Sequence, residues 1–457
     1  MAYPSPKKGR PLVASGLLGM ALFLGGCQTV LNASPSAPQA AIESVPGQVI
    51  VKFRAGTPSA DRTALRDRYG ATGFDGLLPD TERWHVTSEV DSLRSRLIAE
   101  PSLEWAEPNY RREILAYAAS ERGDTSVNQW YLSKDRGIGI DDAWNAMAGT
   151  GTPGTGVMVA VVDTGVDINH PDLQDRIARD DNGVKRFIDE VGHDTSFSTG
   201  TTDYMGMDGN GHGTHVAGLV GATGNNGHLV GVAPGVTILP VKVMRADGGG
   251  EDFSIAKGLK DAADNGADVI NLSVGGPAPS QLLADAIAYD LNKGSTVVIA
   301  SGNGYGPVFY PAAYAGVICV GATSGAPTAP YTIPSYSNRG PELSLVSPGG
   351  DGTHSSADRG IYSTVPTYPT YMSASGIGPS YGILSGTSMA TPIVSGVAAL
   401  VIADAKARGL TLTPSQVRSR LLATARPLGS QTFSSDWGYG LVDPLKAITW
   451  NGPGGTR

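Results

Sequence analysis

Short apolar runs and longer helical patterns alternate along the chain from Trp130 onward. The apolar runs are unbroken, as in strands that are buried on both faces of a sheet. They cover residues 157–162, 236–244, 268–273, 296–300 and 316–321. Between them, helical spacing of apolar side chains is found in residues 212–221, 252–265, 280–292, 388–406 and 414–424. This alternation predicts an α/β fold whose mainly parallel sheet is flanked by helices on both faces.

A different pattern precedes this region and predicts a small α+β domain over residues 47–117. Strand-like stretches are 48–53, 84–86 and 103–110, and helical patterns cover 59–69 and 91–98. We therefore expect a second, larger domain at 128–450, joined through an exposed, cleavable linker at 118–127. Two Gly-, Ser- and Asp-rich segments, 180–207 and 349–380, predict surface loops.

The first 27 residues predict an export signal. Lys7, Lys8 and Arg10 precede an apolar stretch that is too short for a membrane span. The stretch ends in Leu-Gly-Gly-Cys27, which resembles the bacterial lipobox, so we expect lipidation of Cys27 and possible anchoring to the membrane. The alternative is a plain secretory signal. Residues 28–46 are rich in Ala, Ser, Pro and Gln and predict a flexible tether. The expected location is the cell envelope, either as an outer-membrane lipoprotein or in the periplasm, or the outside of the cell after the chain has processed itself.

Charge and cysteine content narrow the class of protein. The formal net charge is -8, which argues against a nucleic acid as partner. The chain has 2 cysteines, Cys27 and Cys319, and cannot form a disulfide framework. We expect Cys319 to be a buried thiol in a strand.

Ser388 lies in a run of small residues directly before the long apolar pattern of 388–406. A serine at a helix amino terminus lies beside backbone N–H groups that have no partner within the helix. Such a place suits a nucleophile whose attack creates an oxyanion. The simpler interpretation is a helix cap.

Asp163 ends the apolar run 157–162, and the carboxyl ends of parallel strands are where sites form in such sheets. Three interpretations compete: a turn residue, one half of an aspartic protease pair, or a carboxylate that orients a histidine. An aspartic protease needs a second Asp-Thr-Gly or Asp-Ser-Gly, and the chain has neither.

A histidine that Asp163 could orient is found in Gly211-His212-Gly213-Thr214-His215, where His212 begins a helical pattern. Two histidines three residues apart raise the question of zinc. The helical His-Glu-x-x-His signature is absent, so we favour His215 as a structural residue. Asn303 follows the apolar run 296–300, and its side-chain amide either forms a turn or donates to an oxyanion.

The order Asp163, His212, Asn303, Ser388 and the runs around these residues resemble the subtilisin-like serine protease family over about residues 125–447. The resemblance implies that Ser388 is the nucleophile, His212 the general base and Asp163 the residue that orients the imidazole. Asn303 and the backbone N–H of Ser388 would form the oxyanion hole. Catalysis would need no cofactor.

The resemblance also implies binding residues. Ser273, Val274 and Gly275 would pair with an extended polypeptide substrate and form one wall of the S1 pocket, which holds the side chain before the cleaved bond. The other wall would be Ala300, Ser301 and Gly302. Backbone pairing implies broad specificity. A structural calcium site would take Asp172, Thr223, Asn225, Gly227 and Leu229. Asp124 is a candidate for the amino-terminal ligand, and a polar surface loop is the alternative.

Residues 47–117 resemble the family's propeptide, which would act as chaperone and inhibitor of its own protease domain. Self-cleavage is then expected near residues 117–124. Two departures from the family pattern stand out: Ile393 replaces a histidine, and Phe309 stands near the base of S1, which favours small side chains there.

We therefore expect an exported, monomeric endopeptidase made as a zymogen. The alternatives are an inactive relative that serves as a binding module and an aspartic protease that uses Asp163.

Overall fold

We describe a computed structural model of the chain, which covers residues 42–118, 129–192, 194, 206–225, 229–325, 331–352 and 359–452. These residues belong to the second of the chain's two units, Gln39–Arg457. The expected export signal with Cys27, the linker from residue 119 onward with Asp124, and Gly227 lie outside the described residues.

The centre of the large domain is a 7-stranded sheet with the order β14-β13-β12-β10-β6-β8-β7. All its pairings are parallel, as the sequence predicts. Its strands are β6 (Met158–Asp163), β7 (Ile188–Asp189), β8 (Thr237–Lys242), β10 (Val269–Leu272), β12 (Thr296–Ala300), β13 (Ile318–Thr323) and β14 (Leu345–Pro348).

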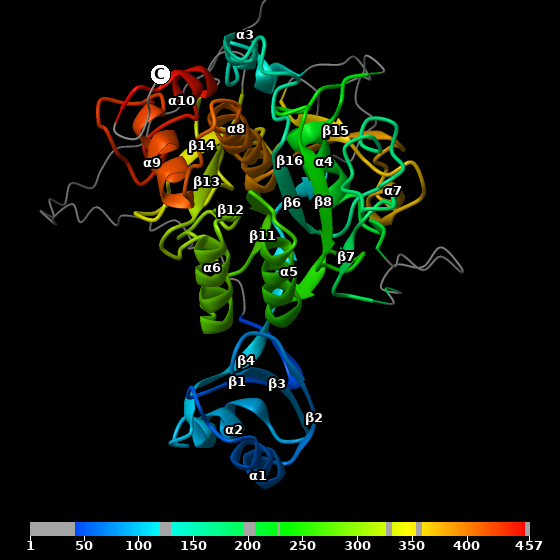
Figure 1. Cartoon of the computed structure of the whole chain (residues 1–457), viewed down its shortest axis with the longest axis vertical. Helices are drawn as coiled ribbons and strands as arrows, with labels where there is room; N and C mark the ends of the chain where they lie inside the picture. Colours follow the sequence, from blue (N-terminus) through cyan, green and yellow to red (C-terminus); the bar gives the residue numbers. More distant parts are fainter. Residues whose placement is uncertain are drawn as a thin grey trace, which may run out of the picture. The chain divides into compact units, whose positions relative to one another are not determined.

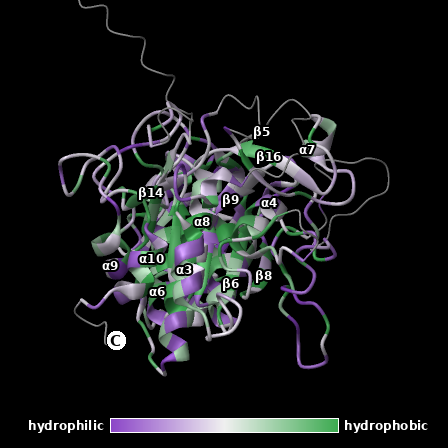
Figure 2. Cartoon of the chain, turned by 90° about the horizontal axis from the view of Figure 1, so that it is seen from above, coloured by the Kyte–Doolittle hydropathy of each residue, from purple (hydrophilic) through white to green (hydrophobic). Residues whose placement is uncertain are grey.

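Helices cover both faces of this sheet (Figure 1). Val159 and Val161 of β6 pack into a core with α4 (His212–Gly221) and α8 (Thr387–Ala407). The alternate residues Ala160 and Val162 pack into a second core with α5 (Asp252–Asp264) and α6 (Gln281–Lys293). Successive side chains of a strand point to opposite faces, so an unbroken apolar run supplies both cores. Figure 2 shows the apolar residues gathered in the interior, with α8 among them.

Helix α8 is the one helix among the described residues that is long and apolar enough to span a membrane, and its most apolar window is 100% buried in the protein. It is therefore a core helix.

The small domain consists of β1 (Ser44–Phe53), α1 (Ser59–Tyr69), β2 (Ala71–Gly76), β3 (Thr81–Val86), α2 (Val90–Leu97) and β4 (Leu103–Ile114). Its strands pair antiparallel in the order β4-β1-β3-β2, and it has its own core around Trp84 and Leu93. Strand β1 begins at Ser44, so the last three residues of the expected tether belong to it. Strand β4 continues to Ile114 and pairs antiparallel with β9 (Gly249–Glu251) and β11 (Val274–Gly275) of the large domain.

The prediction that residues 349–380 form only a surface loop is wrong. Strands β15 (Ile361–Thr364), β16 (Tyr381–Ser385) and β5 (Tyr117–Ala118) form a 3-stranded sheet, and α7 (Tyr371–Ala374) lies between β15 and β16 in sequence. β15 is fully buried although it contains Ser363 and Thr364. Their hydroxyls donate to backbone carbonyls of α4, which removes the cost of burying them and hides the strand from a hydropathy pattern.

The remaining elements are the 3-10 helix η1 (Trp130–Leu132), α3 (Ile140–Ala146), α9 (Pro414–Thr424) and α10 (Pro444–Thr449). Within the expected loop 180–207, the described residues contain only the short strand β7.

Candidate active site

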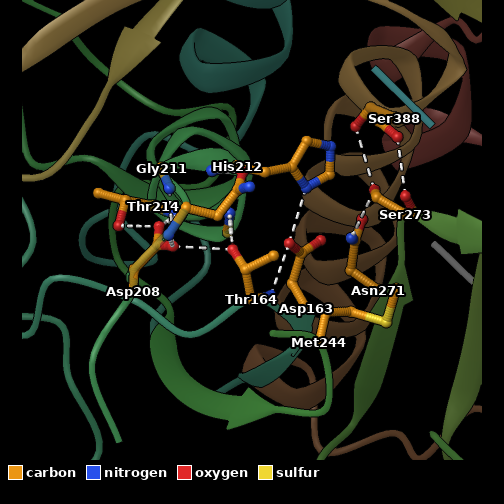
Figure 3. Close-up of polar contacts among 12 residues, drawn as sticks. Asp163, Thr164, Asp208, Gly211, His212, Thr214, Met244, Asn271, Ser273 and Ser388 are labelled. Atoms are coloured by element: carbon orange, nitrogen blue, oxygen red, sulfur yellow. Dashed lines mark hydrogen bonds and ion pairs between the residues drawn. The ribbon is translucent and has the colours of Figure 1, made fainter. Parts of the chain in front are cut away.

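The acid and the imidazole meet at the carboxyl edge of the sheet. β6 ends at Asp163 and α4 begins at His212. The Nδ1 of His212 lies 2.7 Å from the Oδ1 of Asp163, and both side chains are fully buried. Figure 3 shows this contact as a dashed line between the ring and the carboxylate. A carboxylate on Nδ1 holds the proton there and leaves Nε2 as the basic nitrogen.

A second carboxylate, Asp208, holds the turn that places His212, and the sequence did not single it out. Its two oxygens accept hydrogen bonds from the hydroxyls of Thr164 and Thr214 at 2.8 and 2.6 Å. They also accept from the backbone N–H groups of Asn210, Gly211 and Thr214. Asp208 therefore ties the end of β6 to the first turn of α4 (Figure 3).

Ser388 occupies the first turn of α8, as expected, and is fully buried. Its Oγ donates to the carbonyl oxygen of Ser273 at 2.8 Å, and the Oγ of Ser273 donates back to the carbonyl of Ser388 at 3.1 Å. Among the described residues, the Nε2 of His212 has no hydrogen-bond partner. The structure thus joins acid to imidazole but not imidazole to hydroxyl.

Asn303 lies against the start of α8. Its Oδ1 accepts from the N–H and the hydroxyl of Thr387 at 3.0 and 2.8 Å, which fixes the direction of the amide. A Cβ added to Gly386 would lie 3.0 Å from the Nδ2 of Asn303 and 2.5 Å from the carbonyl oxygen of Leu115. The side-chain amide of Asn303, the start of α8 and the carbonyl oxygen of Leu115 therefore lie close together.

The chain itself runs through the site. Residues 111–113 pair with β9 on one side, and Glu113 and Ile114 pair with Gly275 and Val274 on the other. The N–H of Leu115 then donates to the carbonyl of Ser273 at 3.3 Å. The backbone N–H of Ser388 donates to the carbonyl oxygen of Leu115 at 3.2 Å. Beyond Ala116, β5 pairs with β16, and the two strands lie side by side in Figure 2. Strand β16 ends at Ser385, and α8 begins at Thr387.

Of the expected walls of S1, Ser273, Val274 and Gly275 contact this segment as described. Ala300, Ser301 and Gly302 lie at the end of β12, where the ring of Phe309 packs so closely that a Cβ on Gly302 would be 2.7 Å from it. Asn338, which the sequence did not single out, holds this loop. Its amide donates to the carbonyl of Ser301, and its Oδ1 accepts from the N–H groups of Gly304 and Gly306.

His215 lies beneath the site and is structural. Its Nε2 lies 3.0 Å from the carbonyl oxygen of Ile361. Burial, followed by the neighbouring His212, lowers the pKa of His215 to about 3, so the ring is neutral. Within the described ranges, no group of three or more His, Cys, Asp or Glu side chains could hold a metal ion.

The residues expected to bind calcium are only partly assembled from the described chain. Asp172 is fully buried; its Oδ2 accepts from the hydroxyl of Tyr381 at 2.7 Å, and its Oδ1 has no partner among the described residues. The carbonyl of Asp172 accepts from the N–H of Thr223, Leu229 is buried, and Asn225 is exposed.

Two further expectations about single residues concern packing. Ile393, which replaces the family's histidine, is fully buried in the core around α8. Cys319 is a free, buried thiol in β13, and burial raises the pKa of this thiol.

A parallel sheet with an acid–imidazole pair at its carboxyl edge and a serine at a buried helix start defines a serine hydrolase of the α/β class. Comparison with known proteins makes this specific. A family model described as the subtilase family matches residues 154–440. The chain is 34% identical to the thermophilic serine proteinase of Bacillus sp. (strain AK1) over 415 residues, 89% of this chain and 88% of that protein.

Two more relatives agree. Subtilisin Savinase of Lederbergia lenta is 40% identical over 294 residues, which cover 64% of this chain and 91% of that protein. Among solved structures, fervidolysin from Fervidobacterium pennivorans, a keratinolytic enzyme related to subtilisin, matches with a TM-score of 0.69 and 25% identity. The match covers 92% of this chain and 63% of the fervidolysin chain. The chain belongs to the subtilase family and is a subtilisin-like serine endopeptidase.

Proposed function

We propose that Ser388, His212 and Asp163 form the catalytic triad of this endopeptidase. The 2.7 Å contact between His212 and Asp163 supports the roles of base and orienting acid. The position of Ser388 at a helix start, with its N–H on the carbonyl of Leu115, supports its role as nucleophile. The proposal requires that rotation about the Cα–Cβ bond of Ser388 takes its hydroxyl from the Ser273 carbonyl to the Nε2 of His212.

The chemistry follows from these contacts. The Oγ of Ser388 attacks the carbonyl carbon of the substrate while the Nε2 of His212 takes its proton. The carbonyl oxygen becomes an oxyanion, which the N–H of Ser388 and the side-chain amide of Asn303 stabilise. His212 then gives its proton to the leaving nitrogen, the peptide bond breaks, and water later hydrolyses the acyl-enzyme.

The observation that carries the proposal is the carbonyl of Leu115 on the N–H of Ser388, next to an intact acid–imidazole pair. A serine-directed sulfonyl fluoride should label Ser388 and abolish activity. If the reagent labelled another residue and the activity remained, the proposed triad would be refuted. An aspartic mechanism predicts activity in the presence of the reagent, but the carboxylate of Asp163 faces an imidazole and not a second carboxylate.

We propose further that the chain is a zymogen that cleaves its own Leu115–Ala116 bond. The extended course of residues 111–115 along β9 and β11 supports this bond, which lies just before the window expected from the sequence. Residues 47–115 would then be the inhibitory propeptide. Broad specificity, with small side chains favoured by Phe309, remains our expectation for the position before the cleaved bond.

Export is the proposed route, with lipidation at Cys27. Cleavage at Leu115–Ala116 would separate the catalytic domain from this anchor. Fractionation of wild type and Ser388→Ala tests the idea: the variant should stay uncleaved in the membrane fraction while the wild-type catalytic domain is released. Equal retention of both forms would contradict it.

We propose a structural calcium ion at Asp172, with backbone carbonyls of Thr223, Gly227 and Leu229 and the side chain of Asn225. The buried, unpartnered Oδ1 of Asp172 fits a hard cation, which prefers oxygen ligands. Chelator should lower the melting temperature of the Ser388→Ala chain and leave that of a further Asp172→Asn variant unchanged. A melting temperature that does not respond to chelator in either chain would refute the site.

A further inference from the structure

The side chain of Arg112 enters a pocket of the large domain three residues before Leu115. Arg112 is 1% exposed, and its guanidinium bonds to both oxygens of Asp252, with Nη2 and Oδ2 2.9 Å apart. Its Nη1 donates to the carbonyl of Ala278 at 2.7 Å. Asp252 opens α5 and is fully buried.

The walls of this pocket belong to the large domain and remain after the propeptide leaves. Asp252 and the carbonyl of Ala278 provide the polar contacts. Gly276 provides room, since an added Cβ there would lie 3.2 Å from the Nη1 of Arg112. The bidentate contact suits the planar guanidinium, which presents two parallel N–H groups to a carboxylate.

The register that brings Arg112 to the pocket is set by backbone pairing. Arg112 lies opposite Gly250 of β9, and Glu113 lies opposite Gly275 of β11. An extended peptide that pairs in the same way places the side chain of its fourth residue before the cleaved bond into the same pocket.

We propose that Asp252 is a specificity-determining residue, which selects arginine at the fourth position before the cleaved bond. The proposal rests on the proposed function, because it takes Leu115–Ala116 as the register of cleavage. It narrows the broad specificity expected from the sequence to substrates with a basic residue at this one position.

The physical basis is the burial of a charge. A neutral side chain would cover Asp252 without a positive charge beside it, and a buried carboxylate without a counter-charge is strongly unfavourable. Burial raises the pKa of Asp252, and the guanidinium of Arg112 opposes this shift.

The test uses the full chain after it has processed itself, with active sites counted by the serine reagent. The probes are internally quenched peptides with the sequence of residues 109–118, which carry arginine, lysine, citrulline, alanine or glutamate at the position of Arg112. Arginine should exceed citrulline, its neutral isostere, by about 10- to 100-fold in kcat/KM, which corresponds to losing hydrogen bonds to a charged group. Lysine should lie between them and glutamate should be poorest.

Two variants test whether Asp252 causes the preference for arginine. Asp252→Asn should reduce the ratio of arginine to citrulline to near one. Asp261→Asn, on the exposed side of the same helix, should keep the wild-type ratio. Equal cleavage of all five peptides at the Leu–Ala bond by wild type would overturn the inference and make the Arg112–Asp252 pair a propeptide anchor alone. No cleavage of any peptide, or no label on Ser388, would instead overturn the proposed function.

Discussion

Gly213 lets the two sides of the active site approach each other. It follows His212 in α4, and its N–H donates to the hydroxyl of Thr164 at 2.9 Å. A Cβ at this position would lie 2.1 Å from the carbonyl oxygen of Gly165, which is backbone and cannot move aside cheaply. The residue is therefore a glycine because of close approach, since no positive φ is recorded for it.

The substitution Gly213→Ala should push α4 away from the end of β6 and lengthen the contact between His212 and Asp163. Overpacking of this kind destabilises by about 1–3 kcal/mol. We expect a fall in kcat of at least about 100-fold, because small displacements of catalytic groups are costly. Stability in denaturant and kcat measure the two effects. Gly378→Ala, where an added Cβ meets nothing within 4 Å, serves as control and should change neither quantity. Wild-type kcat in Gly213→Ala would contradict the argument.

His215 predicts a specific pH dependence of stability. Its ordinary pKa is 6.5, and in the folded chain the pKa is about 3 because the ring is buried. Between these values the unfolded chain binds a proton that the folded chain does not, so stability falls as the pH is lowered from about 6.5 towards 3. The slope from this group approaches about 1.4 kcal/mol per pH unit.

Replacing the ring should remove this contribution. In the Ser388→Ala chain, which cannot digest itself, His215→Gln keeps a donor for the carbonyl of Ile361 and does not titrate. The loss of unfolding free energy between pH 6.5 and 4.5 should be smaller in the variant by about 2–3 kcal/mol. Urea unfolding at both pH values measures it. Equal losses in the two chains would show that His215 is already charged when folded.

At the scale of elements, the structure agrees best with the sequence-based prediction where the signal for an element lies within that element. The bounds of α1, α4 and α9 agree with the prediction residue for residue. In α9 the reason is visible: Thr413 and Gln416 form a reciprocal capping box, with proline at the first helical position. β15 was missed because its polar residues have partners on α4, which no local pattern contains.

The small domain contributes directly to a helix of the large one. The side chain of Glu107, on β4, accepts hydrogen bonds from the hydroxyl of Ser280 and from the N–H groups of Gln281 and Leu282. It therefore caps the amino terminus of α6 with a negative charge, which the helix dipole favours.

Replacing this cap should loosen the contact between the domains. Glu107→Gln in the Ser388→Ala chain should weaken the contact by about 1–3 kcal/mol, because a charged acceptor is lost. Hydrogen exchange at Gln281 and Leu282 should become faster. Glu104→Gln, at an exposed position of the same strand, should leave the exchange rates unchanged. Unchanged rates in both variants would mean that water caps the helix equally well.

At the scale of the whole molecule, the course of the chain from the small domain into the large one decides where it can be cut. The carbonyl oxygen of Leu115 accepts a hydrogen bond from the N–H of Ser388. The next element in the chain, β5, pairs with β16 of the large domain. The proposed cleavage at Leu115–Ala116 would therefore take place between two segments that are both held by the large domain.

Proline at position 116 should block this step. The substitution Ala116→Pro places a ring on the nitrogen that must accept the proton from His212, so residues 47–115 should stay joined to the catalytic domain. Asp124→Pro, inside the window expected from the sequence, should be processed like wild type. Intact mass spectrometry distinguishes the two. Processing of Ala116→Pro together with a block in Asp124→Pro would place the cut in that later window.

The sequence by itself determined the periodicity of the helices and strands, a mainly parallel sheet with helices on both faces, and Asp163, His212, Asn303 and Ser388 as candidates for the site. These signals are local: an apolar run, a cap, or a short motif around one residue. Tertiary structure alone decided the partners that lie far away in the chain. Asp208 reaches back to Thr164, Asn338 reaches to Ser301, and Asp252 meets Arg112. Each is a single polar residue with no periodic signature, and burial beside its partner gives it a role.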